Sequence, residues 1–118
     1  RYESYYLRTV ADAVALSEAV GAARVQAMGD VFHMNIEEAD IGAALRAAGG
    51  RLGHIHLADS NRIQPGKGHL DFVGVFRALL DIAYDGWMSM ECGVEGDPQT
   101  ALPETVAFLR DQIAAANS

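Results

Sequence analysis

The chain has 118 residues, which is enough for one small domain. Its single cysteine excludes an internal disulfide, and its formal net charge of −7 argues against nucleic acid or an anionic membrane surface as a partner. No apolar run is long enough to cross a bilayer and no signal peptide is visible, so we expect a cytoplasmic protein.

The first half of the chain predicts alternating helices and strands. Residues 9–21 carry an apolar stripe that stops at Gly21, as in an amphipathic helix that ends at a glycine. Residues 24–30 form a short apolar run that predicts a strand, followed by a loop. Residues 37–50 begin with acidic side chains and end in Gly-Gly, which predicts a helix, because a helix dipole favours negative charge at its N-terminus. Residues 51–58 predict the second strand.

The second half continues the alternation. Residues 71–84 predict a helix with Asp71 as its N-cap, and residues 86–92 predict a third strand. Residues 98–116 predict a last helix, either continuous or broken near Pro103.

The predicted order is therefore α-β-α-β-α-β-α, an α/β fold with three strands and about four helices. Short connections between alternating strands and helices imply parallel strands joined by helical crossovers. Because parallel sheets are covered on both faces or close on themselves, three strands make an incomplete barrel or sheet. We expect Met28, Met88 and Met90 to lie in the core and Trp87 to fill a barrel interior.

A polar side chain marks the C-terminal end of each predicted strand. Side-chain alternation places Asp30, His56 and Glu91 on the mixed faces of their strands, at or near the ends where parallel α/β folds collect function. Two carboxylates and an imidazole suit Mn²⁺, Mg²⁺, Co²⁺ or Zn²⁺. Each residue alone is more often a hydrogen-bonded polar group than a metal ligand, and three in phase on consecutive strands are a stronger signal. His54 shares the face of His56 but lies deeper, so we expect a core histidine with a hydrogen-bond partner.

Three segments carry a resemblance to a known family. "GDVFHMNIEE", "HLADSNRIQPGKGHLDF" and "YDGWMSMEC" resemble the C-terminal part of the xylose isomerase-like TIM-barrel superfamily. Within it they are most similar to the sugar isomerase/epimerase group that includes D-tagatose, D-psicose and L-ribulose 3-epimerases. The opening "RYESYYLRTV" fits the same group, so the resemblance covers essentially the whole chain. It implies that residues 1–118 are one domain, part of a (β/α)8 TIM barrel.

The resemblance also implies a set of site residues. The family holds a divalent metal, for which we expect Mn²⁺ first, with two glutamates, an aspartate and a histidine. Asp30, His56 and Glu91 are similar to three of these ligands, and Glu91 is also similar to one of the family's two acid/base carboxylates. The substrate-binding residues implied by the resemblance are His33, Arg62 and Glu3.

One family feature is absent from this sequence. The first glutamate ligand, which is also the other acid/base group, lies before the motif with which the chain begins. We therefore expect metal-dependent ketose isomerase or epimerase chemistry, on a sugar or sugar phosphate, in a complete barrel and little or no activity from this chain alone. Because a partial barrel leaves unpaired strand edges and uncovered apolar surface, we also expect a homo-oligomer.

Other interpretations stay open. The chain could be a non-catalytic, self-associating domain that retains the site residues by descent. It could also resemble another member of the superfamily, such as a hydroxypyruvate isomerase or an inosose dehydratase. An endonuclease-like relative is disfavoured by the net charge of −7 and by the "ADSNR" loop. Which sugar is bound, and whether it is phosphorylated, depends partly on residues outside this sequence.

Overall fold

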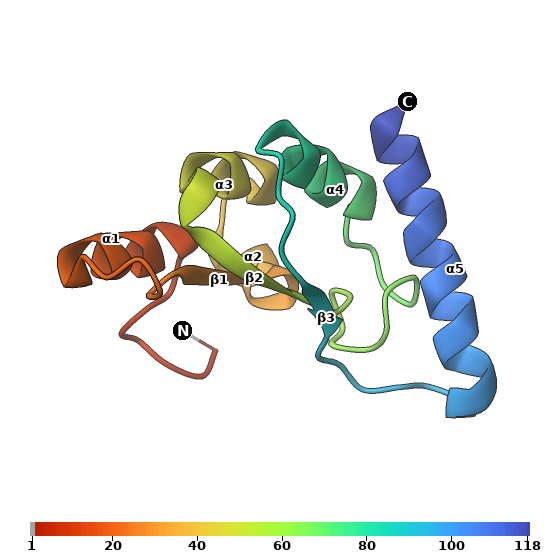
Figure 1. The fold of residues 1–118 in the computed structure, drawn as a ribbon. Helices are drawn as coiled ribbons and strands as arrows, with labels where there is room; N and C mark the ends of the chain where they lie inside the picture. The colour runs from red at the N-terminus through yellow and green to blue at the C-terminus, as the bar shows by residue number, and fades with distance from the viewer. Residues whose placement is uncertain (1) are drawn as a thin grey trace.

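Three short parallel strands form the centre of the structure, in the order β1-β2-β3 (Figure 1). The computed structural model describes residues 2–118. The strands are β1 (Ala27–Asp30), β2 (Leu52–Leu57) and β3 (Met88–Met90). Asp30 pairs with His56 in β2, and His56 pairs with Ser89 in β3. The predicted parallel α/β arrangement is confirmed, and all three strands end at the same edge of the sheet.

Helices follow and connect these strands. In the described part of the chain they are α1 (Val10–Val20), α2 (Val31–Glu37), α3 (Ile41–Ala48), α4 (Phe72–Asp81) and α5 (Pro98–Asn117), with a 3₁₀ turn η1 (Gly49–Arg51). Local capping fixes where they start and stop. Thr9 and Asp12 form a capping box at the start of α1, and Gly21 ends that helix with φ 71°. Asp71 caps α4 as predicted, since its Oδ1 accepts a hydrogen bond from the N–H of Gly74 at 2.9 Å.

Helix α2 was not predicted. The segment after β1 is helical rather than a loop, and the predicted helix over 37–50 is instead the end of α2 followed by α3, which begins at Ile41. The described residues therefore form five α-helices rather than about four, in the order α-β-α-α-β-α-β-α. The cause lies in Asp30, whose carboxylate accepts from the N–H groups of Phe32 and His33 and so caps a helix directly at the strand end.

The last helix is continuous. Pro103 lies inside α5 without interrupting it. Proline removes one N–H donor but has a φ compatible with a helix, so the helix tolerates it at the loss of one hydrogen bond. None of the helices in residues 2–118 is long and apolar enough to span a membrane.

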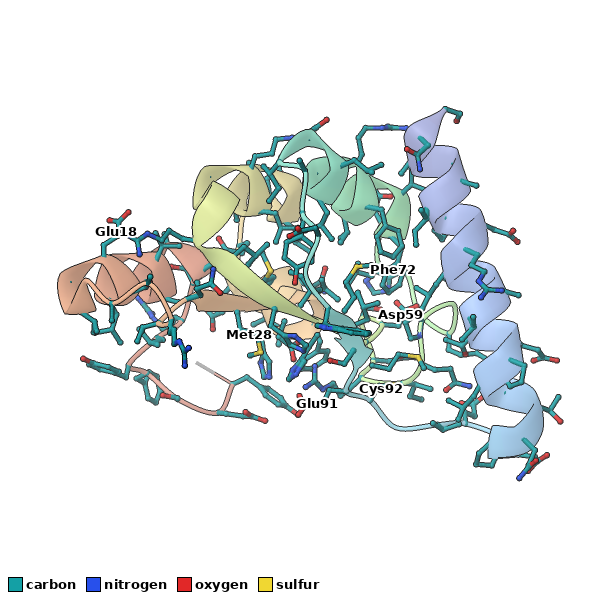
Figure 2. The ribbon with its side chains drawn as sticks, viewed as in Figure 1. Glu18, Met28, Asp59, Phe72, Glu91 and Cys92 are labelled. Atoms are coloured by element: carbon teal, nitrogen blue, oxygen red, sulfur yellow. The ribbon has the colours of Figure 1, made fainter. Side chains whose placement is uncertain are left out.

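The hydrophobic core lies on one side of the sheet. Leu45 of α3, Ile55 of β2 and Phe72 of α4 are fully buried there, and α3 and α4 lie side by side above the strands in Figure 1. In Figure 2, Phe72 lies beneath α4 on the side that faces α5, and Met28 lies on the opposite side of the sheet.

The other side of the sheet is open to solvent in the described chain. Met28 is 45% exposed, so the prediction of a core methionine is wrong for the described residues. Trp87 is 83% exposed, and its predicted place inside a complete barrel stays a prediction. Met88 and Met90 are also exposed, because they lie on an edge strand that the helices cover incompletely. The side chains at the strand ends thus face an open surface.

Candidate metal centre

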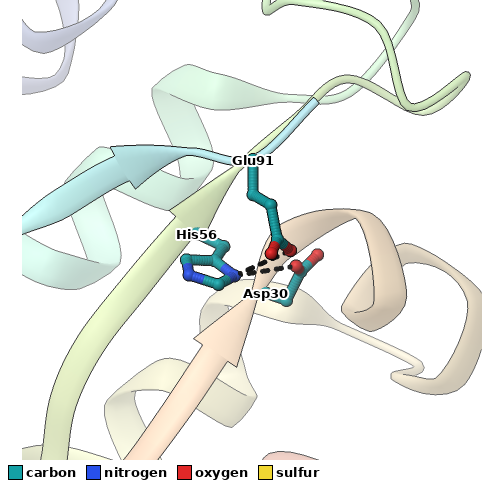
Figure 3. Close-up of side chains that lie close together, drawn as sticks. All are labelled: Asp30, His56 and Glu91. Atoms are coloured by element: carbon teal, nitrogen blue, oxygen red, sulfur yellow. Dashed lines mark ion pairs between the residues drawn. The ribbon is translucent and has the colours of Figure 1, made fainter. Parts of the chain in front are cut away.

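Three side chains from three strand ends converge on one point (Figure 3). Asp30 ends β1, His56 lies next to the last residue of β2, and Glu91 directly follows β3. Nδ1 of His56 lies 3.3 Å from Oδ2 of Asp30 and 3.1 Å from Oε2 of Glu91. The parallel register explains the convergence, because Asp30 and His56 are direct cross-strand partners and the N–H of Glu91 bonds to the neighbouring carbonyl of Leu57 at 3.1 Å.

These donor atoms could hold a divalent cation. Nδ1 of His56 is buried and has no hydrogen-bond partner, although the two carboxylate oxygens lie beside it. Buried polar atoms are rarely left without a partner, and this one points at an acceptor-rich position. Ligands bound about 2.1 Å from one ion lie about 3.0 Å apart at a right angle and about 3.4 Å apart at a tetrahedral angle. The two spacings from Nδ1 of His56 fall between these values, and all three ligand atoms lie within 4.8 Å of one another. One nitrogen with carboxylate oxygens suits Mn²⁺, Mg²⁺, Co²⁺ or Zn²⁺.

The two carboxylate oxygens of Asp30 have different neighbours: one accepts hydrogen bonds from the protein, and the other faces the candidate metal position. Its Oδ1 accepts from the N–H groups of Phe32 at 3.1 Å and His33 at 3.2 Å, and from Nη1 of Arg62 at 2.7 Å. Its Oδ2 faces His56. Burial raises the pKa of Asp30, but the hydrogen bonds from Arg62 and from the His33 N–H outweigh it, so the pKa lies below its ordinary value of 3.8. The side chain is therefore ionised at neutral pH.

Arg62 links the two carboxylates. Its Nη2 lies 2.7 Å from Oε2 of Glu91 while its Nη1 bonds Asp30, and its guanidinium carbon lies 4.8 Å from the centre of the Phe32 ring. Burial lowers the pKa of Arg62, but the hydrogen bond and the charge of Asp30 and the charges of Glu91 and Glu3 raise it above its ordinary value. The arginine is a fixed cation beside the candidate metal position.

The other predicted substrate contacts lie on the far side of Asp30. Nε2 of His33 lies 3.8 Å from Oε2 of Glu3, and the ring of Tyr2 packs 5.5 Å from that of His33. These residues and Asp30 line a cleft of about 410 Å³ that runs along β1 towards α1. The structure thus brings the sequence-predicted site residues into one region: Glu3, His33 and Asp30 line the cleft, and Arg62 joins Asp30 to Glu91 beside it.

His54 is placed as a structural residue. Its Nε2 lies 2.6 Å from Oγ of Ser89 on the neighbouring strand, so the expected hydrogen-bond partner is present. The expected core position is wrong, because His54 is only half-buried. The ring packs edge-on against that of His56, with centroids 5.3 Å apart. His54 therefore supports the sheet beneath the candidate site.

Sequence reasoning missed a buried carboxylate in the loop after β2. Asp59 is 1% exposed and accepts from the N–H groups of Ser60 at 2.8 Å, Gly66 at 2.8 Å and Leu70 at 3.1 Å. Only glycine fits at position 68, because an added Cβ would lie 2.3 Å from Oδ1 of Asp59. The close spacing of an aspartate and two glycines in "ADSNRIQPGKG" was the available signal, and it indicates a loop folded around a carboxylate.

Comparisons with known proteins show which family the chain is similar to. A family model described as a xylose isomerase-like TIM barrel matches residues 1–112. D-psicose 3-epimerase of Enterocloster bolteae is 47% identical over 91 residues, which are 77% of this chain and 30% of that protein. The 3-dehydro-D-guloside 4-epimerase of Escherichia coli is 39% identical over 111 residues, or 93% of this chain and 42% of that protein.

Solved structures extend the likeness to the fold. A structure of L-ribulose 3-epimerase superposes with a TM-score of 0.89 at 32% identity, covering 97% of this chain and 44% of that one. The chain thus spans less than half the length of each of these relatives, and its strands and helices form part of a barrel. The chain belongs to the xylose isomerase-like TIM barrel family.

Proposed function

We propose that this chain carries the metal-binding side of a ketose epimerase site, in which Asp30, His56 and Glu91 hold a divalent cation, Mn²⁺ by preference. The observation that carries the proposal is the convergence of Nδ1 of His56 with one oxygen each of Asp30 and Glu91, three ligand atoms that lie within 4.8 Å of one another. The similarity to relatives named D-psicose 3-epimerase and L-ribulose 3-epimerase supports a ketose, free or phosphorylated, as the substrate class.

The proposed site residues have separate roles in epimerisation. A carbon beside a carbonyl is epimerised when a weakly acidic C–H proton leaves from one face and a proton returns to the other, which calls for an acid/base group on each face; by resemblance both groups are carboxylates. A bound divalent ion supplies Lewis-acid stabilisation of the negative charge that develops on the substrate oxygens. The carboxylate of Glu91 performs one of the two proton transfers. Arg62, His33 and Glu3 orient the hydroxyl groups by hydrogen bonds, which fixes the reacting carbon beside Glu91.

The second carboxylate is not among the residues proposed here. By resemblance it is a glutamate in a part of the barrel that residues 1–118 do not cover, and it also completes the ligand set. We therefore propose that the 118-residue chain binds Mn²⁺ but turns over little or no ketose, and that a barrel containing the preceding strands is active.

A Mn²⁺ titration by calorimetry tests the metal site. Asp30→Asn keeps an oxygen that can cap α2 and replaces the other carboxylate oxygen by an amide group, so we expect at least about tenfold weaker binding. Asp40→Asn is the matched control, because Asp40 caps α3 by accepting from the N–H of Ala43 at 2.8 Å, away from the site. Equal losses in the two variants, or no binding by the unmodified chain, would contradict the proposal.

A second candidate function is a self-associating domain without catalysis. The exposed side chains of Met28 and Trp87 on the open sheet face favour it, since apolar patches of this kind mark interfaces. Light scattering coupled to gel filtration decides it: a monodisperse monomer at micromolar concentration contradicts self-association, whereas a homo-oligomer that binds no Mn²⁺ favours this second function over the first.

A further inference from the structure

The backbone N–H groups of Glu91, Gly93 and Glu95 all donate hydrogen bonds to β2 or to the loop that follows it. The N–H of Glu91 donates to the carbonyl of Leu57 at 3.1 Å, as in an ordinary strand pair. Two residues later, the N–H of Gly93 donates to the carbonyl of Arg62 at 2.9 Å. Another two residues on, the N–H of Glu95 donates at 2.8 Å to a side chain, Oε1 of Gln64. The spacing of two residues is that of a β-strand edge.

The side-chain amide of Gln64 bonds the backbone of Glu95 as the backbone of a neighbouring strand would. Its Nε2 also donates to the carbonyl of Glu95 at 2.9 Å, so one side-chain amide satisfies both backbone groups of the same residue. Gln64 is 1% exposed, although it lies in an irregular loop with glycines and a lysine. A primary amide donates through its nitrogen and accepts through its oxygen at the same time, as a backbone peptide group does. The burial of a polar group with both bonds made indicates a built contact.

The hydrogen bonds between Gln64 and Glu95 lie close in sequence to the Arg62–Glu91 ion pair. Arg62 is two residues before Gln64, and it adopts a left-handed φ of 62°, which non-glycine residues hold only where the surroundings fix them. Its backbone carbonyl bonds Gly93 while its guanidinium bonds Glu91. The two segments that carry Arg62 and Glu91 are therefore fastened at Leu57 on one side of the pair and at Gln64 on the other.

We infer that Gln64 is a positioning residue for Glu91 and Arg62. Its amide holds the segment 93–95 against the loop after β2, which keeps the Glu91 carboxylate aimed at His56. This inference rests on the proposed metal site, because a positioned Glu91 matters to a cation only if Glu91 is a ligand. Gln64 touches neither the ligand atoms nor the cleft lined by Glu3 and His33, so its effect passes through the backbone.

Gln64→Met tests the inference, since methionine is close to glutamine in size but has no amide. Two readouts are compared with the unmodified chain: amide hydrogen exchange at Gly93 and Glu95 followed by NMR, and the Kd for Mn²⁺. We expect exchange at both amides to be about tenfold faster and the Kd for Mn²⁺ to rise about 3- to 10-fold. If this variant does not fold, Gln64→Asn, which keeps the amide but is one methylene too short, is used with the same expectations.

Thr105→Val is the matched control. Thr105 is also buried and lines a small pocket with Pro65, Gly66 and Lys67, but its Oγ1 donates within α5, to the carbonyl of Ala101 at 2.8 Å, so its loss leaves the bonds between Gln64 and Glu95 in place. We expect this variant to lose stability without changing either readout. Unchanged exchange at Gly93 and Glu95 in the Gln64 variant overturns the inference, as does faster exchange with an unchanged Kd. If the unmodified chain binds no Mn²⁺, the proposed function fails, and the exchange readout alone then decides whether Gln64 fastens the two segments.

Discussion

Arg62 and His56 share one oxygen of Glu91. Oε2 of that carboxylate lies 2.7 Å from Nη2 of Arg62 and 3.1 Å from Nδ1 of His56. A cation bound between His56 and Glu91 therefore competes with the guanidinium for the same atom, while the Oδ2 of Asp30 meets no such competition, because Arg62 bonds Oδ1. Arg62 thus opposes metal binding even as it aligns the two carboxylates.

Replacing Arg62 should tighten metal binding. We expect Arg62→Met to lower the Kd for Mn²⁺ about 3- to 10-fold, because it removes a like charge and frees Oε2 of Glu91, with the gain limited by solvent screening. Calorimetric titration measures it. Arg46→Met is the control, since Arg46 pairs with Asp81 at 2.8 Å on the surface away from the site. Weaker binding in the Arg62 variant would mean that alignment of the carboxylates outweighs the charge competition.

The two histidines of β2 should behave differently. We expect His56→Gln to weaken Mn²⁺ binding by at least about tenfold and His54→Gln to leave it within about twofold, because only His56 has a free nitrogen facing the carboxylates while His54 bonds Ser89. Both variants keep a polar side chain of intermediate length. A large loss in the His54 variant would place that residue among the ligands.

The buried carboxylate of Asp59 should make the protein sensitive to acid. Burial raises the pKa of Asp59, but hydrogen bonds from the N–H groups of Ser60, Leu70 and Gly66 outweigh it, so the folded-state pKa lies below the unfolded value of 3.8. A depressed pKa contributes stability above the unfolded pKa, and that contribution is lost as pH falls from about 3.8 through the folded value.

Asp59→Asn is expected to cost about 2 kcal/mol of unfolding free energy at pH 7, because one amide cannot accept all of these hydrogen bonds. Urea denaturation from pH 7 to pH 2.5 measures the difference between the variant and the unmodified chain. The difference should shrink below about pH 4. A constant difference across this range would show that ionisation of Asp59 does not support the loop.

A left-handed residue after α4 offers a stabilising change. Ala83 has φ 51°, and its N–H bonds the carbonyl of Leu80 at 2.9 Å, a conformation that favours glycine. We expect Ala83→Gly to raise the unfolding free energy by about 0.5–1 kcal/mol. The opposite change, Gly21→Ala at φ 71°, should lower it by about 1 kcal/mol. Urea denaturation compares them, and a destabilised Ala83→Gly would contradict the strain argument.

Some of the fold was accessible from sequence because it is local. Three such signals are the period of the apolar residues, the cap at Asp71 and the glycine that ends α1. Each acts within a few residues, so it can be recognised without knowing which distant segment packs beside it. The sequence pattern does not reveal helix α2, because Asp30 is both the last residue of β1 and the N-cap of α2, with no residue between the strand and the helix. The exposure of Met28 and Trp87 could not be inferred, because burial depends on what covers a face and not on the residue itself.

The sequence by itself determined that a carboxylate, an imidazole and a second carboxylate end three successive strands, because side-chain alternation along a strand is a property of the chain. Only the tertiary structure decided which atoms meet. The strand register sets His56 Nδ1 between Asp30 and Glu91, and Gln64 reaches Glu95 across 31 positions of sequence. Contacts between distant segments depend on how strands pair and loops close, and no local pattern encodes the resulting distances.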